Sequence, residues 1–365
     1  MARFGIDARE YSTSTGRYVY KLVENLEKLD KDNEYFILLQ EKDFRDASFS
    51  NPRFKAVLTP FKEFSVGEQL GFARQLYKLK VDLVHFGMTQ QPMLYFKRSV
   101  TTVHDLTTAR FINPDKNSAV FLLKQQVYKL VIWYAAHKSK RVIVPSNYVL
   151  KDLVTYTKIK PNKVVVTHEA ADLIDQPTSA IKDLGNKRFI MYIGRPTPHK
   201  NLWRLIEAFA ALKVTHQDLC LVLAGKMDNN YRDIERRVEE SGVKDVIFTD
   251  FVSDGELKWM YQNCEAYVFP SLSEGFGLPG LEAMAHGAPV VSSNATCLPE
   301  IYGDSALFFD PLDVSAITKA IDQVISDDKL RARLIETGYK QVKLYSWEVM
   351  AKQTLDVYNQ ALKRL

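Results

Sequence analysis

Short apolar runs alternate with amphipathic segments along the first half of the chain. The apolar runs have the length and composition of buried strands, and they read "RFGIDA" (3–8), "EYFILLQ", "FKAVLTP", "VDLVHF", "SVTTV", "RVIVPS" and "KVVVTHE". Between them, helical spacing of apolar positions predicts helices over 16–29, near 66–79, over 118–137 and from Asn147 onward. Strands that alternate with helices in this way are typical of a parallel sheet. The pattern predicts an N-terminal, doubly wound α/β domain over residues 1–171.

A stretch without periodicity separates this domain from a second one. Residues 172–187, "DLIDQPTSAIKDLGNK", have the composition of a linker. The alternation then resumes with "RFIMYIG", "LCLVLAG", "VIFTDF", "AYVFPS", "PVVSS" and "ALFFD", and helices are expected over 313–325, 328–344 and 347–364. We predict a second domain over 188–346, and a terminal helix within 347–365 that packs back on the N-terminal domain. The predicted fold class is α/β, with two Rossmann-like parallel-sheet domains facing a central cleft.

The composition is that of a folded globular protein. The chain has 365 residues, of which 46% are hydrophobic and 25% charged, and this length favours two cores over one. The longest strongly apolar stretch, "LVIWYAA" at 130–136, is too short to span a bilayer, and the start "MARFGIDARE" predicts no secretory signal. Three scattered cysteines fit buried thiols in a reducing compartment. We therefore expect a cytoplasmic protein.

Basic residues concentrate in the first half of the chain. Residues 1–180 hold 27 lysines and arginines against 19 acids, whereas the remainder holds 22 against 25. Residues 116–151 contain no acid, and their basic and aromatic side chains are Lys116, Phe121, Lys124, Tyr128, Lys129, Trp133, Tyr134, Lys138, Lys140, Arg141 and Lys151. This segment is either a core-packed helix with a basic polar face or a surface that docks on anionic lipid. Nothing else in the chain resembles a nucleic-acid module, so we expect no nucleic-acid partner.

A glycine-rich turn follows the strand "AYVFPS" and reads "SLSEGFGLPGLEAMAHG" over 271–287. Pro279 suits the first turn of a helix, so the turn is expected to feed a helix start whose amides can bind phosphate or sugar oxygens. Glu282 is expected in the first turn, where the helix dipole stabilises a carboxylate. Taken singly, Glu274 is better explained as an exposed loop acid and Glu282 as an ordinary helix-start acid.

Further polar residues follow other strands. Arg195 and Lys200 lie in "GRPTPHKN" (194–201), directly after a predicted strand, where they could hold a diphosphate or remain solvated surface charges. His104 and Asp105 end the strand "SVTTV", and this pair could be structural or part of a site. Gly16 precedes the first long helix, either as a phosphate-binding turn or as a plain helix start.

The segment from Glu274 to Glu282 resembles, nearly residue for residue, the E-x7-E motif of retaining GT-B glycosyltransferases of family GT4 (glycosyl transferases group 1). The segments "GRPTPHKN" and "TVHDL" (102–106) match two further signatures of that family, so the resemblance covers both predicted domains. Two features depart from the family pattern. Asp250 stands where the family commonly has glycine, and Gly16 is the one glycine kept of a Gly-Gly-x-Gly type of loop.

The resemblance implies roles for individual residues. Glu282 would accept hydrogen bonds from the donor ribose, and Glu274 would hold hydroxyls of the donor sugar together with the amides of Phe276, Gly277 and Leu278. Arg195 and Lys200 would neutralise the departing nucleoside diphosphate. The remaining expected contacts are Val252 to the nucleobase, Gly16 to the diphosphate and His104 to the donor sugar near the reacting centre, with Asp105 orienting the acceptor or the local backbone.

The function implied is a retaining glycosyltransferase with a nucleotide-sugar donor and a glycan or lipid-linked glycan acceptor. The stretch "TVHDLTTARFINPD" resembles mannosyltransferases that use GDP-mannose, and UDP-sugars are the main competing donors. A nucleotide-sugar epimerase of the same architecture is a rival hypothesis, and a non-catalytic nucleotide-sugar binding protein is a third. The D-x-D triplet at 30–32 is explained better as a turn, so we expect neither a metal nor another cofactor. A lipid-linked acceptor would be met at the inner face of the plasma membrane.

Overall fold

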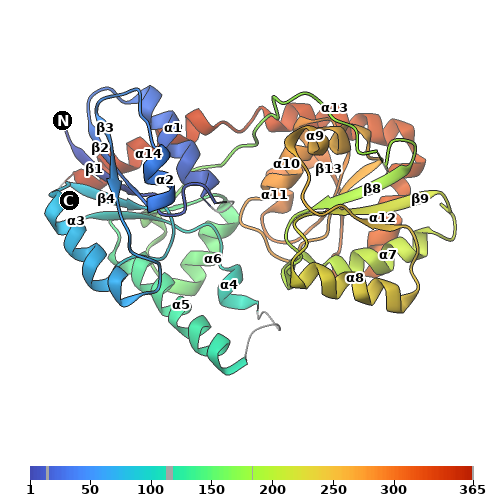
Figure 1. The fold of residues 1–365 in the computed structure, drawn as a ribbon, viewed down its shortest axis with the longest axis horizontal. Coiled ribbons are helices and arrows are strands. Elements are labelled where there is room, and N and C mark those ends of the chain that lie inside the picture. Colours follow the sequence, from blue (N-terminus) through green and yellow to red (C-terminus); the bar gives the residue numbers. More distant parts are fainter. Residues whose placement is uncertain (14–15, 112–117, 183, 364–365) are drawn as a thin grey trace. The chain divides into compact units, whose positions relative to one another are not determined.

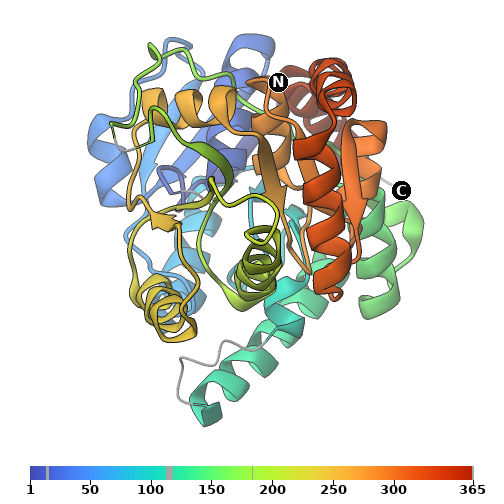
Figure 2. The ribbon, with the colours of Figure 1, turned by 90° about the vertical axis from the view of Figure 1, so that its right-hand side faces the viewer.

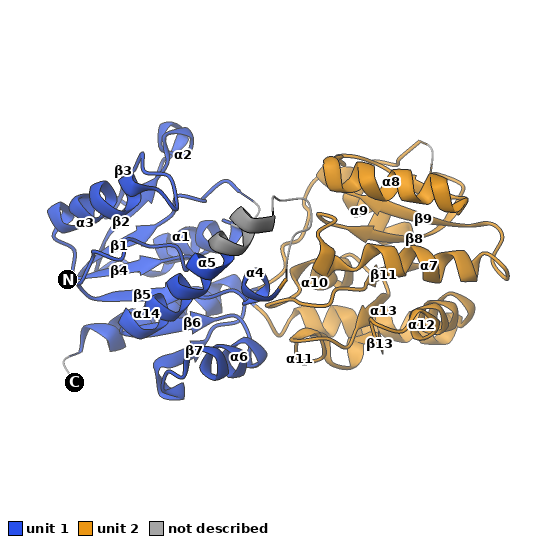
Figure 3. Cartoon of the chain, turned by 90° about the horizontal axis from the view of Figure 1, so that it is seen from below, with its two compact units in different colours: residues 1–110, 116–169, 346–365 blue, residues 111–115, 170–345 orange. Residues whose placement is uncertain are grey.

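The computed structural model describes residues 1–365 except 14–15, 112–117, 183 and 364–365, and it describes no side chain of residues 118–124. The chain forms two compact units (Figures 1 and 3). Unit 1 comprises residues 1–110, 116–169 and 346–365, and unit 2 comprises residues 111–115 and 170–345. The first unit is therefore closed by the last segment of the chain.

Seven described strands of unit 1 form a parallel sheet in the order β3-β2-β1-β4-β5-β6-β7. They are β1 (Arg3–Asp7), β2 (Glu34–Leu39), β3 (Phe54–Leu58), β4 (Leu83–Phe86), β5 (Ser99–Thr102), β6 (Arg141–Val144) and β7 (Val164–Val166). The helices of this unit are α1 (Arg17–Leu29), α2 (Glu41–Asp46), α3 (Ala73–Leu79), α4 (Thr107–Arg110), α5 (Ser118–Lys138), α6 (Asn147–Thr157) and α14 (Trp347–Leu362). The strand order reverses between β1 and β4, which makes this a doubly wound sheet.

Six described strands of unit 2 form a second parallel sheet in the order β10-β9-β8-β11-β12-β13. They are β8 (Arg188–Ile193), β9 (Leu219–Ala224), β10 (Val246–Phe248), β11 (Ala266–Phe269), β12 (Val290–Ser293) and β13 (Ala306–Phe309). Helices lie on both sides of this sheet (Figure 2), and they are α7 (Leu202–Leu212), α8 (Asn229–Ser241), α9 (Asp254–Asn263), α10 (Leu278–Ala285), α11 (Leu298–Tyr302), α12 (Val314–Ser326) and α13 (Asp328–Val342). Here the order reverses between β8 and β11.

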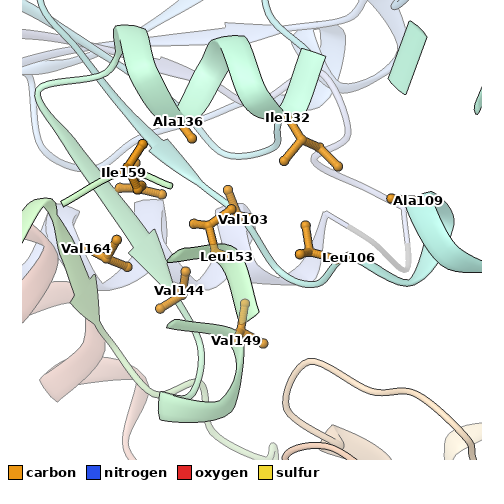
Figure 4. Packing of buried hydrophobic residues seen from close by; sticks show 11 residues of the cluster. Val103, Leu106, Ala109, Ile132, Ala136, Val144, Val149, Leu153, Ile159 and Val164 are labelled. Carbon is orange, nitrogen blue, oxygen red and sulfur yellow. The ribbon is translucent and has the colours of Figure 1, made fainter. Parts of the chain in front are cut away.

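The strands form where the sequence has continuous apolar runs because both faces of each sheet are covered. One core cluster of unit 1 joins α5 to α6 and the strands between them, and Figure 4 shows Ile132, Val144 and Leu153 pointing into it. All three side chains are fully buried. The α/β fold class predicted from the sequence is thus confirmed.

The last helix, α14, completes unit 1. It packs along α1, and its Tyr358 ring lies 5.0 Å from that of Phe4 on β1. The Tyr358 hydroxyl is 2.6 Å from Nδ1 of the buried His85 on β4, whose Nε2 is 2.8 Å from Oγ1 of Thr102. Burial, followed by the charge of His104, lowers the pKa of His85 to about 3, so this histidine is neutral.

One segment differs from the expected regular helix, whereas the triplet at 30–32 forms the expected turn. The segment near 66–79 begins as a π-helix over Glu68–Phe72 before α3, and π-type turns are rare and cannot be read from apolar spacing. Asp30, at the end of α1, accepts hydrogen bonds from the Tyr35 hydroxyl at 2.6 Å and from Nδ2 of Asn33 at 2.8 Å. The Asp30 carboxylate thus serves a turn within unit 1.

Candidate functional site

The strand-order reversal of unit 2 brings two polar loops together at the carboxyl end of its sheet. The loop after β8 contains a 3-10 turn over Pro198–Lys200, and the loop after β11 leads to α10. The amide of Leu272 donates to the carbonyl of His199 at 2.7 Å, which joins the loops directly. Nδ2 of Asn201 donates to the carbonyls of Pro270 and Pro311. The two segments that the sequence identified separately therefore form one surface.

Lys200 and Glu274 form an ion pair on this surface. Nζ of Lys200 donates to Oε1 of Glu274 at 2.6 Å, and the two side chains are 18% and 13% exposed. Nζ of Lys200 also lies 5.5 Å from the ring centroid of Phe269 at the end of β11. Both residues were candidates from the sequence, but their contact was not predicted. A donor sugar or diphosphate bound here would have to share or break this pair.

The backbone of Glu274 is held by Thr296 and Cys297, neither of which was a candidate from the sequence. Its amide donates to Oγ1 of Thr296 at 3.1 Å, and its carbonyl accepts from Sγ of Cys297 at 3.4 Å. Thr296 has a φ of +56°, a left-handed conformation that is uncommon for a β-branched residue. Such strain is found where a site demands a particular backbone path.

Tyr302 holds the glycine turn that precedes α10. Its fully buried hydroxyl donates to the carbonyl of Gly277 at 2.6 Å, and burial keeps the pKa of Tyr302 well above the ordinary range, so the donor proton is retained. Gly277 has a φ of +88°, and a Cβ there would lie 2.6 Å from both the Tyr302 hydroxyl and Cδ2 of Leu298. Glycine is therefore required at position 277 by conformation and by space.

One expectation about Glu282 is wrong. Because α10 begins at Leu278, Glu282 is the fifth helical residue and lies in the second turn, and the first turn contains no acid. The dipole of the helix start therefore does not act on Glu282 as argued from the sequence. The carbonyl of Glu282 accepts from Nδ1 of His286, whose Nε2 accepts from the amide of Ile174.

Phe276 is buried in the turn, with its ring 5.3 Å from that of Tyr345.

Arg195 leaves the end of β8 after Gly194 and is exposed. Its guanidinium makes no ion pair with any residue that the structure describes. The carbonyl of Gly194 accepts from the hydroxyl of Tyr231 at 2.9 Å, which fixes the strand end from which Arg195 projects. Arg195 is thus a cation without a protein counter-ion in the described part of the chain.

Val252 lies half-buried between β10 and α9. Asp250, which replaces the family's usual glycine, has a φ of +56° and so adopts the left-handed conformation that a glycine would take. Its carboxylate accepts from the amide of Met227 at 2.7 Å. Aspartate tolerates this region better than most residues, so the departure preserves the local backbone path.

His104 in unit 1 is held between two acceptors. Its Nδ1 is 3.0 Å from Oε1 of Glu169, and its Nε2 is 3.0 Å from the carbonyl of Gly87. Burial alone would lower the pKa of His104, but the hydrogen bond and charge of Glu169 outweigh it and the pKa is raised. Two acceptors require two N–H donors, so the geometry favours the imidazolium form. Asp105 caps the short helix α4 through the amide of Thr107 at 2.7 Å.

Gly16 is explained by a close approach of the backbone. It precedes α1 with a φ of −80°, so positive φ is not the reason for glycine here. A Cβ at this position would lie 1.6 Å from the carbonyl oxygen of Glu10. The turn therefore requires glycine for space, whether or not its amide meets a ligand.

The basic segment over 116–151 is only partly visible. Lys116 and the side chains of Phe121 and Lys124 lie outside the described residues. Lys138 points inward, with Nζ 5.3 Å from the ring centroids of Phe86 and Tyr95, and burial lowers its pKa to about 8. Across the described residues, no helix is both long enough and apolar enough to cross a bilayer.

Both halves of the chain match known protein families. Residues 15–174 match Glycosyltransferase Family 4, and residues 176–341 match Glycosyl transferases group 1. The O-antigen chain mannosyltransferase B of Escherichia coli is 32% identical over 273 residues, which are 72% of this chain and 70% of that protein. The chain belongs to the group 1 glycosyltransferases.

Other relatives of this glycosyltransferase are matched over less of their length. The serotype-specific mannosyltransferase WbdA of E. coli is 30% identical over 62% of this chain but only 29% of its own length. The MMP alpha-(1->4)-mannosyltransferase of Mycolicibacterium hassiacum is 30% identical over 63% of this chain and 56% of its own length.

Solved structures agree with the GT-B fold of this glycosyltransferase. Sucrose-phosphate synthase from Thermosynechococcus elongatus superposes with a TM-score of 0.77 at 19% identity, covering 99% of both chains. Anabaena Alr3699/HepE in complex with UDP-glucose superposes with a TM-score of 0.73 at 14% identity, covering 99% of this chain and all of that one. These identities support the architecture alone.

No group of three or more metal-ligating side chains occurs among the residues that the structure describes. The absence of a metal from the reaction nevertheless stays a prediction.

Proposed function

We propose that this glycosyltransferase transfers mannose from GDP-mannose to a glycan or lipid-linked glycan with retention of the anomeric configuration. The observation that carries the proposal is the Lys200–Glu274 pair at the strand-order reversal of unit 2, with Arg195 beside it on the same loop. The carboxyl ends of strands at such a reversal are where doubly wound sheets bind ligands. The mannosyltransferase names of the relatives support mannose as the sugar.

In this proposal the cations of unit 2 bind the donor diphosphate. The bond between the anomeric carbon and the diphosphate oxygen breaks with its electron pair passing to the diphosphate. The acceptor oxygen bonds to the same face of that carbon, and its proton passes to the departing diphosphate. Arg195 and Lys200 stabilise the charge that develops on the leaving group. Glu274 then holds sugar hydroxyls, and Glu282 the ribose.

A pocket of unit 1 supports the proposal that the acceptor carries a sugar. It has a volume of about 580 Å³ and lies between the segment after β1, the start of α1 and α2. Its lining combines aromatic rings with charged groups, including Tyr11, Tyr20, Arg17, Asp43 and Asp46. Aromatic faces pack on the apolar faces of sugars, and charged groups bind hydroxyls, so this lining suits a carbohydrate.

Membrane contact is proposed for the outer side of α5. Val127, Leu130 and Trp133 recur at a spacing of three residues and are each about half exposed. Lys129 lies among them in the sequence, and apolar side chains flanked by cations suit the interface of an anionic bilayer. The proposal would place the acceptor at that surface.

A UDP-sugar is the second candidate donor because a structural neighbour was solved with UDP-glucose. Thermal unfolding in the presence of GDP-mannose, UDP-glucose and ADP-glucose separates the donors. A ligand at about 100 times its Kd stabilises by about 2.7 kcal/mol, which corresponds to roughly 5–10 °C for a unit of this size. A shift with UDP-glucose alone would overturn the GDP-mannose assignment.

The metal-independent mechanism is tested separately. Turnover with the preferred donor should be unchanged after treatment with EDTA, since Arg195 and Lys200 are proposed to supply the positive charge. Loss of activity that manganese restores would refute this part of the proposal. The anomeric configuration of the product, read by NMR, tests retention.

A further inference from the structure

A cationic pocket lies at the amino-terminal edge of the unit 1 sheet. It has a volume of about 590 Å³ and lies where α5 and α6 end and β6 and β7 begin. His104 and Glu169 leave the opposite edge of the same sheet, after β5 and β7. The pocket is therefore separate from the candidate sites already described.

The lining of this pocket is basic and contains no acid. Its residues are His137, Lys138, Ser139, Lys140, Arg141, Lys158, Ile159, Lys160, Asn162 and Lys163. Lys138 turns its ammonium group inward to Gln91, so the pocket cations are the other four lysines and Arg141. No carboxylate of a described residue pairs with any of these five. Like charges concentrated in this way cost stability unless an anion joins them.

The cations are close enough to perturb one another. Burial, and then the charges of Lys140 and Arg141, lowers the pKa of Lys163 to about 8. Nε of Arg141 is buried and has no hydrogen-bond partner among the described residues. Lys163 donates to the carbonyl of His137 at the end of α5, which explains one cation as a helix-end contact. That explanation does not extend to Lys140, Lys158 or Lys160.

The base of the pocket is formed by a buried core residue. Ile159 is 6% exposed and belongs to the core cluster, where Figure 4 shows it near Ala136 and Val164. Lys158 has a φ of +60° at the end of α6, which turns the chain sharply before Lys160. A fixed apolar base with cations around it is the construction of a binding site for a compact anion.

We propose that this pocket binds a phosphate-bearing anion with at least two negative charges. Ammonium and guanidinium groups are the usual protein ligands of phosphate, and both kinds line this pocket. A soluble diphosphate and the phosphate of a lipid headgroup share this chemistry. The proposal does not depend on the proposed donor or acceptor.

Hydrogen–deuterium exchange of the full chain localises the binding. Inorganic pyrophosphate and phosphatidylglycerol vesicles are added in separate arms, at about 50 mM salt to limit screening. We expect slower exchange in peptides over 137–141 and 158–163 with at least one probe. Protection by pyrophosphate identifies a soluble anion, and protection by vesicles alone identifies a lipid headgroup. Protection over 194–200 and 274–280 would report the donor site instead.

A matched pair of double variants tests the assignment. The double variant Lys140→Gln/Lys160→Gln should bind the probe that slowed exchange about tenfold or more weakly, because two charged donors are lost. Lys78→Gln with Lys352→Gln removes the same charge from exposed positions elsewhere in unit 1 and should change binding less than about twofold. No protection by either probe, or equal binding by both double variants, would overturn the proposal.

Discussion

Replacing Tyr302 by phenylalanine tests how the glycine turn of unit 2 is held. The variant keeps the buried ring but removes the hydroxyl that donates to the Gly277 carbonyl at 2.6 Å. That carbonyl then keeps the amide of Gly280 as a donor at 3.2 Å, so the loss of one buried hydrogen bond should cost about 0.5–1.5 kcal/mol. Urea unfolding of the full chain measures this loss, with Trp203 and Trp259 as fluorescent reporters in unit 2.

The same variant should impair the proposed donor site. The turn that ends at Gly277 carries Glu274, and a displacement of about 1 Å in a catalytic group commonly lowers turnover by tenfold or more. Tyr345→Phe is the matched control because it keeps the ring that packs on Phe276 and removes a hydroxyl that donates at 3.0 Å to the Ile301 carbonyl and not to the turn. It should lose stability with little loss of turnover. Wild-type stability and turnover in Tyr302→Phe would refute the reasoning.

Two further predictions concern the charged groups. Lys200→Ala and Glu274→Gln should each lower turnover by about 100-fold or more. The control Lys319→Ala, on the exposed side of α12, should leave turnover unchanged. Wild-type turnover in either site variant would contradict the placing of Lys200 and Glu274 in the donor site. The pKa of His104 is raised in the folded state. Protonated His104 therefore stabilises the fold fully below about pH 6.5, the ordinary pKa of histidine, and this stabilisation is lost as the pH rises through the pKa of the folded state. Glu169→Gln should lower that pKa in an NMR titration, and an unchanged midpoint would contradict the imidazolium assignment.

The sequence predicted the fold well because both sheets are buried on both faces. The strands of unit 2 therefore appear as continuous apolar runs such as "RFIMYIG" and "LCLVLAG", which local composition reveals. The π-helix at Glu68–Phe72 was missed because a one-residue change of helical period leaves no separate signal in the sequence. Glu282 was placed one turn too early because helix ends vary with the capping geometry, here at Gly277.

The candidate site was predicted in part. Lys200 and Glu274 were identified from two separate signatures, but their contact depends on β8 and β11 being neighbours, which the order of elements along the chain does not state. Thr296 and Tyr302 were missed because each acts through a contact with a turn more than twenty residues away. An unusual φ at Thr296 and a buried hydroxyl at Tyr302 are visible only in three dimensions.

The return of α14 to unit 1 has a consequence for biosynthesis. The segment 170–345 is complete before α14 leaves the ribosome, so unit 2 can fold while unit 1 still lacks its last helix. At about 5–20 residues per second, the 176 residues of that segment take roughly 10–35 s to make. During that time His85 has no Tyr358 to bond, and the surface of α1 that α14 will cover remains open. Unit 1, most of which is made first, thus cannot reach its final form until the last helix has been made.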